Sequence, residues 1–197
     1  LATMFFGLIS YFMVSPVSQT YQIDLGIPSA VAVSAVMLGS IVNAGARLVL
    51  PTLADKVGRI VCIKGVLIVA VIAMGVLAVS RSLAVTVAVV LMYGCYGGIM
   101  GSFPSLTSSI FGMKHTGENY GFVMFGIVFA TFGAPAISGL VSSNGYEMNV
   151  VFGIGAVFAV IAFVCLTLLG RNLVKEHAEK SVGAKKGTAQ VRKPQAE

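Results

Sequence analysis

One arginine stands inside a long apolar stretch of the sequence, and its chemistry is the strongest functional signal. Arg47 lies within the run from Pro28 to Leu50, about 12 Å along a helix from Asp55. A charge at the centre of a membrane helix costs about 2.5–3.5 kcal/mol, so such a residue normally faces a cavity or a partner. A guanidinium offers a planar fork of donors that suits a carboxylate. The alternative is an arginine whose side chain extends to the membrane interface.

No acidic residue lies well inside any apolar stretch, so the sequence supplies no counter-ion for Arg47. Asp24 and Glu147 fall at the ends of such stretches, and Asp55 lies in a polar break. An anionic substrate is therefore a candidate counter-ion. Proton coupling would have to use acidic residues outside this chain.

Six apolar stretches must position this arginine, and each is long enough to cross a membrane. A spanning helix needs about 20 mostly apolar residues to cross about 30 Å of hydrocarbon. None of the six has the polar stripe of a soluble amphipathic helix. We predict an all-α membrane protein with a six-helix transmembrane bundle over residues 1–170. The predicted spans are Ala2–Tyr21, Pro28–Leu50, Ile60–Val79, Leu83–Phe111, Tyr120–Val141 and Asn149–Leu169.

The composition agrees with a membrane protein and sets the charge apart at one end. The chain is 57% hydrophobic and 10% charged, whereas a soluble domain has about 25% charged residues. Seven of the 13 Lys and Arg residues lie in residues 171–197. This stretch has no aromatic residue, so we predict a basic, disordered cytoplasmic tail. A basic tail beside a membrane span indicates a topology signal rather than nucleic-acid binding.

The distribution of cations predicts the orientation of the spans. With strict alternation, eleven cations share one side, namely Lys56, Arg59, Lys64, Lys114 and the seven of the tail. Only Arg81 falls on the opposite side. Positive residues accumulate in cytoplasmic loops. We therefore expect a multi-pass protein of the inner (plasma) membrane with its C-terminus in the cytoplasm.

No group of residues has the spacing of an enzyme site or a metal site. The three cysteines, Cys62, Cys95 and Cys165, are scattered and show no paired spacing. The sequence contains no recognisable nucleophile–base pair and no loop that would cradle a phosphate. We therefore expect a carrier rather than an enzyme, with no cofactor and no metal.

The polar break after the second predicted span carries a recognisable motif. Asp55, Lys56, Gly58 and Arg59 resemble the major facilitator superfamily loop that reads Gly-x-x-x-Asp-Arg-x-Gly-Arg, although Pro51 replaces the leading glycine. The resemblance implies half of a major facilitator fold, equivalent to helices 7–12 of a twelve-helix transporter. It also implies that these four residues act as a conformational latch.

Further motifs resemble the oxalate:formate antiporter family. They are Asn43-Ala44-Gly45-Ala46-Arg47, Tyr96-Gly97-Gly98, Phe103-Pro104, Phe111-Gly112-Met113-Lys114 and Asn119-Tyr120-Gly121. Together they cover most of residues 40–135. The resemblance implies that Arg47 binds substrate, that Tyr96 belongs to an aromatic cage around the carboxylate, and that Asn43 belongs to the same site. Interhelical packing is the alternative role for Tyr96.

Two departures from related families bear on the substrate. Members typed as oxalate carriers have a lysine where this chain has Ile127. A single cation fits a monoanion such as formate, lactate or pyruvate better than a dianion. The related monocarboxylate transporters pair their arginine with an acidic residue at the position of Val36, so proton coupling of that kind fits less well.

We therefore expect a transmembrane carrier of a small organic anion that works by alternating access. Its partners would be the anion, the lipid bilayer and a six-helix N-terminal half carried elsewhere. Oxalate/formate exchange falls within this expectation. Two alternatives stay open: a facilitator for a different substrate, such as a sugar or a drug, and a truncated membrane protein that does not transport.

Overall fold

The computed structural model describes the backbone of residues 1–191 and the side chains of residues 1–173, and within this range the chain is all-helical. The prediction of an all-α membrane bundle is confirmed. The helices are α1 (Ala2–Val14), α2 (Ser18–Asp24), α3 (Ser29–Val57), α4 (Arg59–Val79), α5 (Ala84–Phe111), α6 (Thr116–Ser143) and α7 (Met148–Val191). Five of them, α3 to α7, have the length and composition of membrane spans.

The first predicted span is broken into two helices, where the sequence suggested one. Helix α1 ends at Val14 and α2 begins at Ser18. Pro16 has no N–H, so the carbonyl of Phe12 loses its usual helical donor. The next amide, of Val17, donates to the Val14 carbonyl at 3.2 Å, which is the tighter three-residue spacing. The proline therefore ends α1, and the chain continues in the short helix α2.

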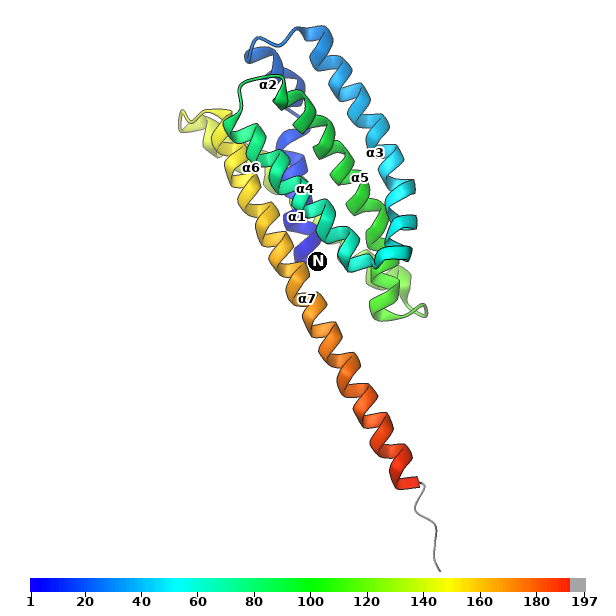
Figure 1. Cartoon of the computed structure of the whole chain (residues 1–197). Helices are drawn as coiled ribbons and strands as arrows, with labels where there is room; N and C mark the ends of the chain where they lie inside the picture. The colour runs from blue at the N-terminus through cyan, green and yellow to red at the C-terminus, as the bar shows by residue number, and fades with distance from the viewer. Residues whose placement is uncertain (192–197) are drawn as a thin grey trace, which may run out of the picture.

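The core of the bundle lies between α1, α4, α5 and α7, while α3 and α6 lie at its outside (Figure 1). In the most apolar stretch of α4 and α5, 44% and 50% of the residues are buried. The corresponding fractions are 11% for α3 and 17% for α6. Both outer helices therefore present large apolar side chains outward, among them Met37, Ile41, Phe122, Phe129 and Phe132.

The connections alternate between the two ends of the bundle. The turn between α3 and α4 and the loop between α5 and α6 lie at the end from which α7 projects (Figure 1). Lys56, Arg59 and Lys114 belong to this end. At the opposite end Arg81 forms an exposed ion pair with Glu147, with 2.7 Å between Nη2 and Oε2.

The prediction of a disordered tail is wrong for residues 171–191, because α7 continues through them to Val191. This stretch is rich in Ala, Lys and Glu, which are strong helix formers. It also extends a helix that already exists, so no new nucleus has to form. The remaining residues of the predicted tail, 192–197, lie outside the described part of the chain.

A single glycine connects α3 to α4. Gly58 has φ +107° and ψ 129°, a backbone conformation that residues other than glycine rarely adopt. Its N–H donates to the Ala54 carbonyl at 2.9 Å, and its carbonyl accepts from the Cys62 N–H at 3.0 Å. One residue therefore caps both helices and sets the angle at which α4 leaves α3.

We expect Gly58→Ala to destabilise the protein by about 1–3 kcal/mol, because alanine would be strained in the positive-φ backbone conformation of this position. Thermal unfolding in detergent, followed by circular dichroism, measures the change. Gly75→Ala is the matched control, since a methyl group there meets nothing within 4 Å and alanine favours a helix. Equal unfolding temperatures for Gly58→Ala and the wild type would contradict this account of the turn.

Candidate functional site

Helices α3 and α5 touch backbone to backbone at the residues that carry the candidate site. A methyl group at Gly97 would overlap the carbonyl oxygen of Asn43. A methyl group at Gly101 would lie 2.8 Å from the carbonyl oxygen of Arg47. Small residues allow such approach in membrane helices. The glycines of α5 therefore allow the backbone of α3 to contact α5 at Asn43 and Arg47, which sets the positions of these two residues relative to α5.

Pro51 adds a second constraint at the same place. Because proline has no N–H, it cannot donate to the carbonyl four residues earlier, which belongs to Arg47. That carbonyl faces Gly101, and the Pro51 ring lies 3.1 Å from the position of a Gly101 methyl group. The backbone that carries the arginine is thus held between a proline and a glycine.

The side chains of Arg47, Asn43 and Tyr96, which sequence analysis singled out, lie together. Arg47 Nε donates to Asn43 Oδ1 at 3.1 Å. The Arg47 Cζ atom lies 5.4 Å from the centroid of the Tyr96 ring, within the range of a cation–π contact. The Nε position is therefore occupied, whereas Nη1 and Nη2 make no hydrogen bond within the described residues.

The direction of the Arg47 side chain bears on the alternative that it extends to the interface. Position 47 is closer to the end of α3 at Val57 than to its start at Ser29. Asn43 and Tyr96 hold the guanidinium on the side of the earlier turn, away from the nearer end. A side chain that extended to the interface would take the shorter route. The contacts therefore favour a guanidinium kept at depth over one that reaches the headgroups.

Tyr96 belongs to an aromatic cluster made by Tyr11, Phe12, Tyr93 and Tyr96. The rings of Tyr11 and Tyr96 stack with centroids 4.1 Å apart and planes 12° apart. Tyr93 meets Tyr11 edge to face at 5.3 Å, and Phe12 meets Tyr96 at 5.9 Å. Offset stacking and edge-to-face contacts are the favourable arrangements of aromatic rings. The cluster joins α1 to α5, and its Tyr96 ring lies against the Arg47 guanidinium.

Sequence analysis missed the part of this cluster that α1 contributes. Tyr11 lies in the middle of an apolar helix and is 8% exposed, and its hydroxyl accepts a bond from Ser15 Oγ at 3.2 Å. A buried tyrosine hydroxyl normally needs a partner. A tyrosine followed four residues later by serine was the signal available in the sequence.

No acidic side chain neutralises Arg47 within the described residues. The ion pairs found among residues 1–173 join Asp55 to Arg59, Arg81 to Glu147 and His115 to Glu118. Arg47 is exposed on this bundle. The site therefore presents a positive charge, with two donor groups that have no partner among the described residues, on the face of the bundle formed by α3 and α5.

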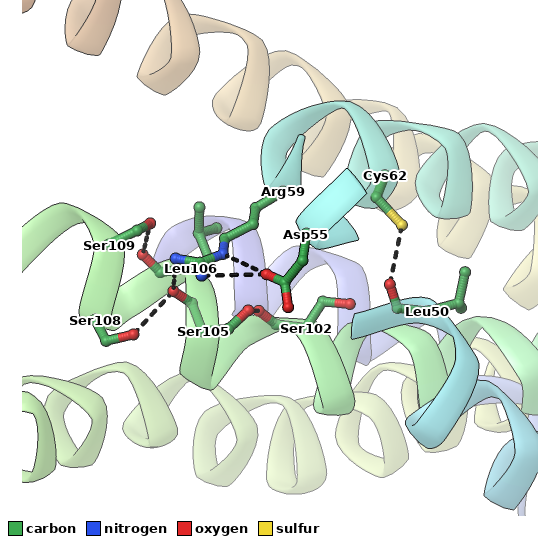
Figure 2. A network of polar contacts seen from close by, with 9 residues as sticks. All are labelled: Leu50, Asp55, Arg59, Cys62, Ser102, Ser105, Leu106, Ser108 and Ser109. Atoms are coloured by element: carbon green, nitrogen blue, oxygen red, sulfur yellow. Dashed lines mark hydrogen bonds and ion pairs between the residues drawn. The ribbon is translucent and has the colours of Figure 1, made fainter. Parts of the chain in front are cut away.

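The residues of the predicted latch form a separate group at the α3–α4 turn. Asp55 Oδ1 accepts bonds from Nε and Nη2 of Arg59, both at 3.2 Å. Nη1 of Arg59 donates to the Ser105 carbonyl at 2.8 Å (Figure 2). Arg59 thereby ties the turn to α5, with Gly58 providing the bend. Lys56 is exposed and takes no part in this network.

We expect Gly97→Ala to destabilise the protein by about 1–3 kcal/mol, since α3 must move away from α5 to admit the methyl group. Gly45→Ala is the matched control on α3, because a methyl group there meets nothing within 4 Å. Thermal unfolding in detergent compares the two variants. The backbone contact would lose its proposed importance if Gly97→Ala unfolded at the same temperature as Gly45→Ala.

Two curated relatives resemble this chain over part of its length. The uncharacterized MFS-type transporter YhjX of Escherichia coli K12 is 36% identical over 97 residues, covering 48% of this chain and 24% of the relative. The oxalate:formate antiporter of Oxalobacter formigenes is 26% identical over 155 residues, covering 77% of this chain and 37% of the relative. The chain thus spans well under half the length of these relatives.

The family itself is given by a match over most of the chain. The model of the Major Facilitator Superfamily matches residues 1–127, which contain the α3–α4 turn and the contacts among Arg47, Asn43 and Tyr96. Several apolar helices together with this match make the chain an integral, multi-pass membrane protein. The chain belongs to the Major Facilitator Superfamily.

Proposed function

We propose that the chain forms one half of a carrier that moves a small organic monoanion across a membrane by alternating access. Formate, lactate and pyruvate are candidates, as is formate in exchange for oxalate. The observation that carries the proposal is the arrangement at Arg47, a guanidinium held by Asn43 and Tyr96 with two donor groups free. The similarity to an oxalate:formate antiporter supports an anionic substrate.

The free edge of the guanidinium suits one carboxylate. With Nε bonded to Asn43, the remaining fork consists of Nη1 and Nη2, which can donate in parallel to the two oxygens of a single carboxylate. The Tyr96 ring beneath the guanidinium restricts the approach to one side. A second carboxylate of a dianion would need its own cation, and Ile127 stands where a lysine would supply it. This reasoning favours a monocarboxylate.

A second six-helix half would complete the site. Helix α3, which carries Arg47, and helix α6 are the least buried of the five long apolar helices. Substrate sites of such carriers lie near the bilayer midplane, between two structural repeats that rock against each other. Enclosing Arg47 between two halves would remove it from lipid and strengthen its attraction for an anion in a low-dielectric cavity.

The group at the α3–α4 turn is proposed as the conformational latch, with Asp55, Lys56, Gly58 and Arg59 as its residues. The exposed Asp55–Arg59 pair is worth only about 0–1 kcal/mol, so it can break and form again during a transport cycle. The cations gathered at this end favour a cytoplasmic location. The protein would then lie in an inner (plasma) membrane with its C-terminus also on the cytoplasmic side.

We expect Arg47→Ala to lower the uptake of a labelled monocarboxylate about a hundredfold, since losing one partner of an enclosed charge pair costs roughly 3 kcal/mol. Arg47→Lys keeps the charge but loses the fork, so about a tenfold loss is expected. The assay uses proteoliposomes that contain the protein at its natural length. Competition by unlabelled formate, lactate and oxalate ranks monoanions against a dianion.

Arg81→Ala is the control for this test. It removes an arginine whose ion pair is exposed at the opposite end of the bundle, so uptake should stay near the wild-type rate. Unchanged uptake by Arg47→Ala would refute the anion carrier. Uptake of a neutral sugar that depended equally on Arg47 would refute it as well.

A further inference from the structure

A cavity lies between α3, α4 and α5, on a different face of α3 from Arg47. Its volume is about 420 Å³, and every lining side chain is apolar or a glycine or cysteine. On α3 it is lined by Val42, Ala46, Leu50, Leu53 and Val57. At about 100° per residue, these positions fall on one face whose centre lies about 100° from Arg47. Helix α4 forms another wall, and among the described residues it shares no hydrogen bond or cation–π contact with Arg47.

The cavity is an open groove rather than a closed void. Val57 and Val61, at one end, are 56% and 58% exposed. A methyl group added to Gly65, on the α4 wall, would meet nothing within 4 Å. From residue 42 to residue 57 the groove follows α3 for about 22 Å, compared with about 15 Å for one leaflet of the hydrocarbon core. The groove is therefore long enough to receive a chain that enters from one leaflet.

The dimensions and chemistry of the groove restrict its occupant. Spread over about 22 Å of α3, the volume of about 420 Å³ gives a mean cross-section of about 19 Å². A helix about 10 Å wide has a cross-section of roughly 80 Å², so it could lie over the groove but not within it. A polar solute would find only the thiols of Cys62 and Cys95, which already donate to the carbonyls of Leu50 and Val66. A single, thin, apolar chain fits both limits.

A cation stands beside the open end of the groove. Lys56 precedes Val57, is exposed, and forms no ion pair within residues 1–173. The neighbouring Arg59 is instead engaged by Asp55 and by the Ser105 carbonyl. An ammonium group at the end of an apolar groove complements a molecule with an anionic head and an apolar tail.

We propose that this groove binds one acyl chain of an anionic phospholipid, with the lipid phosphate beside Lys56. The acyl chain lies along the apolar walls of α3 and α4, and the headgroup remains at the membrane surface. Lipid bound here contacts the helix that carries Arg47 and the turn that contains Gly58. Lys56 also belongs to the proposed latch, but the lipid proposal rests on the groove and its charge and not on the identity of the transported anion.

Photo-crosslinking tests this proposal. The protein, at its natural length, is reconstituted in phosphatidylcholine with a trace of phosphatidylglycerol or phosphatidylcholine that carries a diazirine in its acyl chain. Peptide mass spectrometry then locates the adducts. We expect adducts in residues 42–57 and 61–69, with several-fold more from phosphatidylglycerol than from phosphatidylcholine. Lys56→Gln should remove this preference and keep the acyl adducts.

Gly65→Leu should fill the groove and lower its adducts several-fold. Gly75→Leu is the matched control on α4, since Gly75 also has open space around it and does not line the groove. Adducts spread evenly over exposed positions of α6 and α7, with no headgroup preference, would overturn the proposal and indicate annular lipid only. The wild-type map and Lys56→Gln decide the question even if Gly65→Leu does not fold.

Discussion

A guanidinium inside an apolar helix needs hydrogen-bond and electrostatic partners nearby. The close contact between α3 and α5 supplies them for Arg47. The backbones of these helices meet at Asn43 and Arg47 because Gly97 and Gly101 carry no side chain. This close approach brings Tyr96 beneath the guanidinium. The aromatic stacking between Tyr96 and Tyr11 then connects the pair to α1. Glycines, arginine and aromatic rings thus form one structural unit across three helices.

The outward faces of α3 have different chemistry, which gives one helix two roles. Arg47 and Asn43 occupy a polar face, and Val42, Ala46 and Leu50 line an apolar groove about a quarter turn away. The Gly58 turn joins this helix to α4 and to the Asp55–Arg59–Ser105 network. A shift of α3 would therefore displace Arg47, the wall of the groove and the Gly58 turn together. The proposed alternating-access mechanism requires such coupling along the helix that carries Arg47.

The apolar stretches predicted the spans because hydrocarbon imposes a strong compositional constraint. The association of Arg47, Asn43 and Tyr96 was also predicted, from motifs rather than from packing. The break between α1 and α2 was not predicted from Pro16, because a proline can either kink a helix or end it, and packing against neighbouring helices decides between the two. The helix beyond residue 170 was not predicted, because a charged stretch without aromatic residues indicates disorder by composition, although its Ala, Lys and Glu residues favour continuation of the preceding helix. Tyr11 was missed because its role depends on a contact with α5, far away in sequence.

If Arg47 faces water and an incoming carboxylate, the face of α3 that carries it must be reachable from water, and substituted cysteines measure that access. Ser40 lies two turns before Arg47 on the same face of α3, and its hydroxyl bonds only within its own helix among the described residues. In the protein at its natural length, a membrane-impermeant thiol reagent should label Ser40→Cys much faster than Ile72→Cys, which is exposed on α4. Formate should slow that labelling several-fold, and Arg47→Ala should abolish the protection. Equal labelling of the two cysteines, or labelling indifferent to formate, would contradict the account.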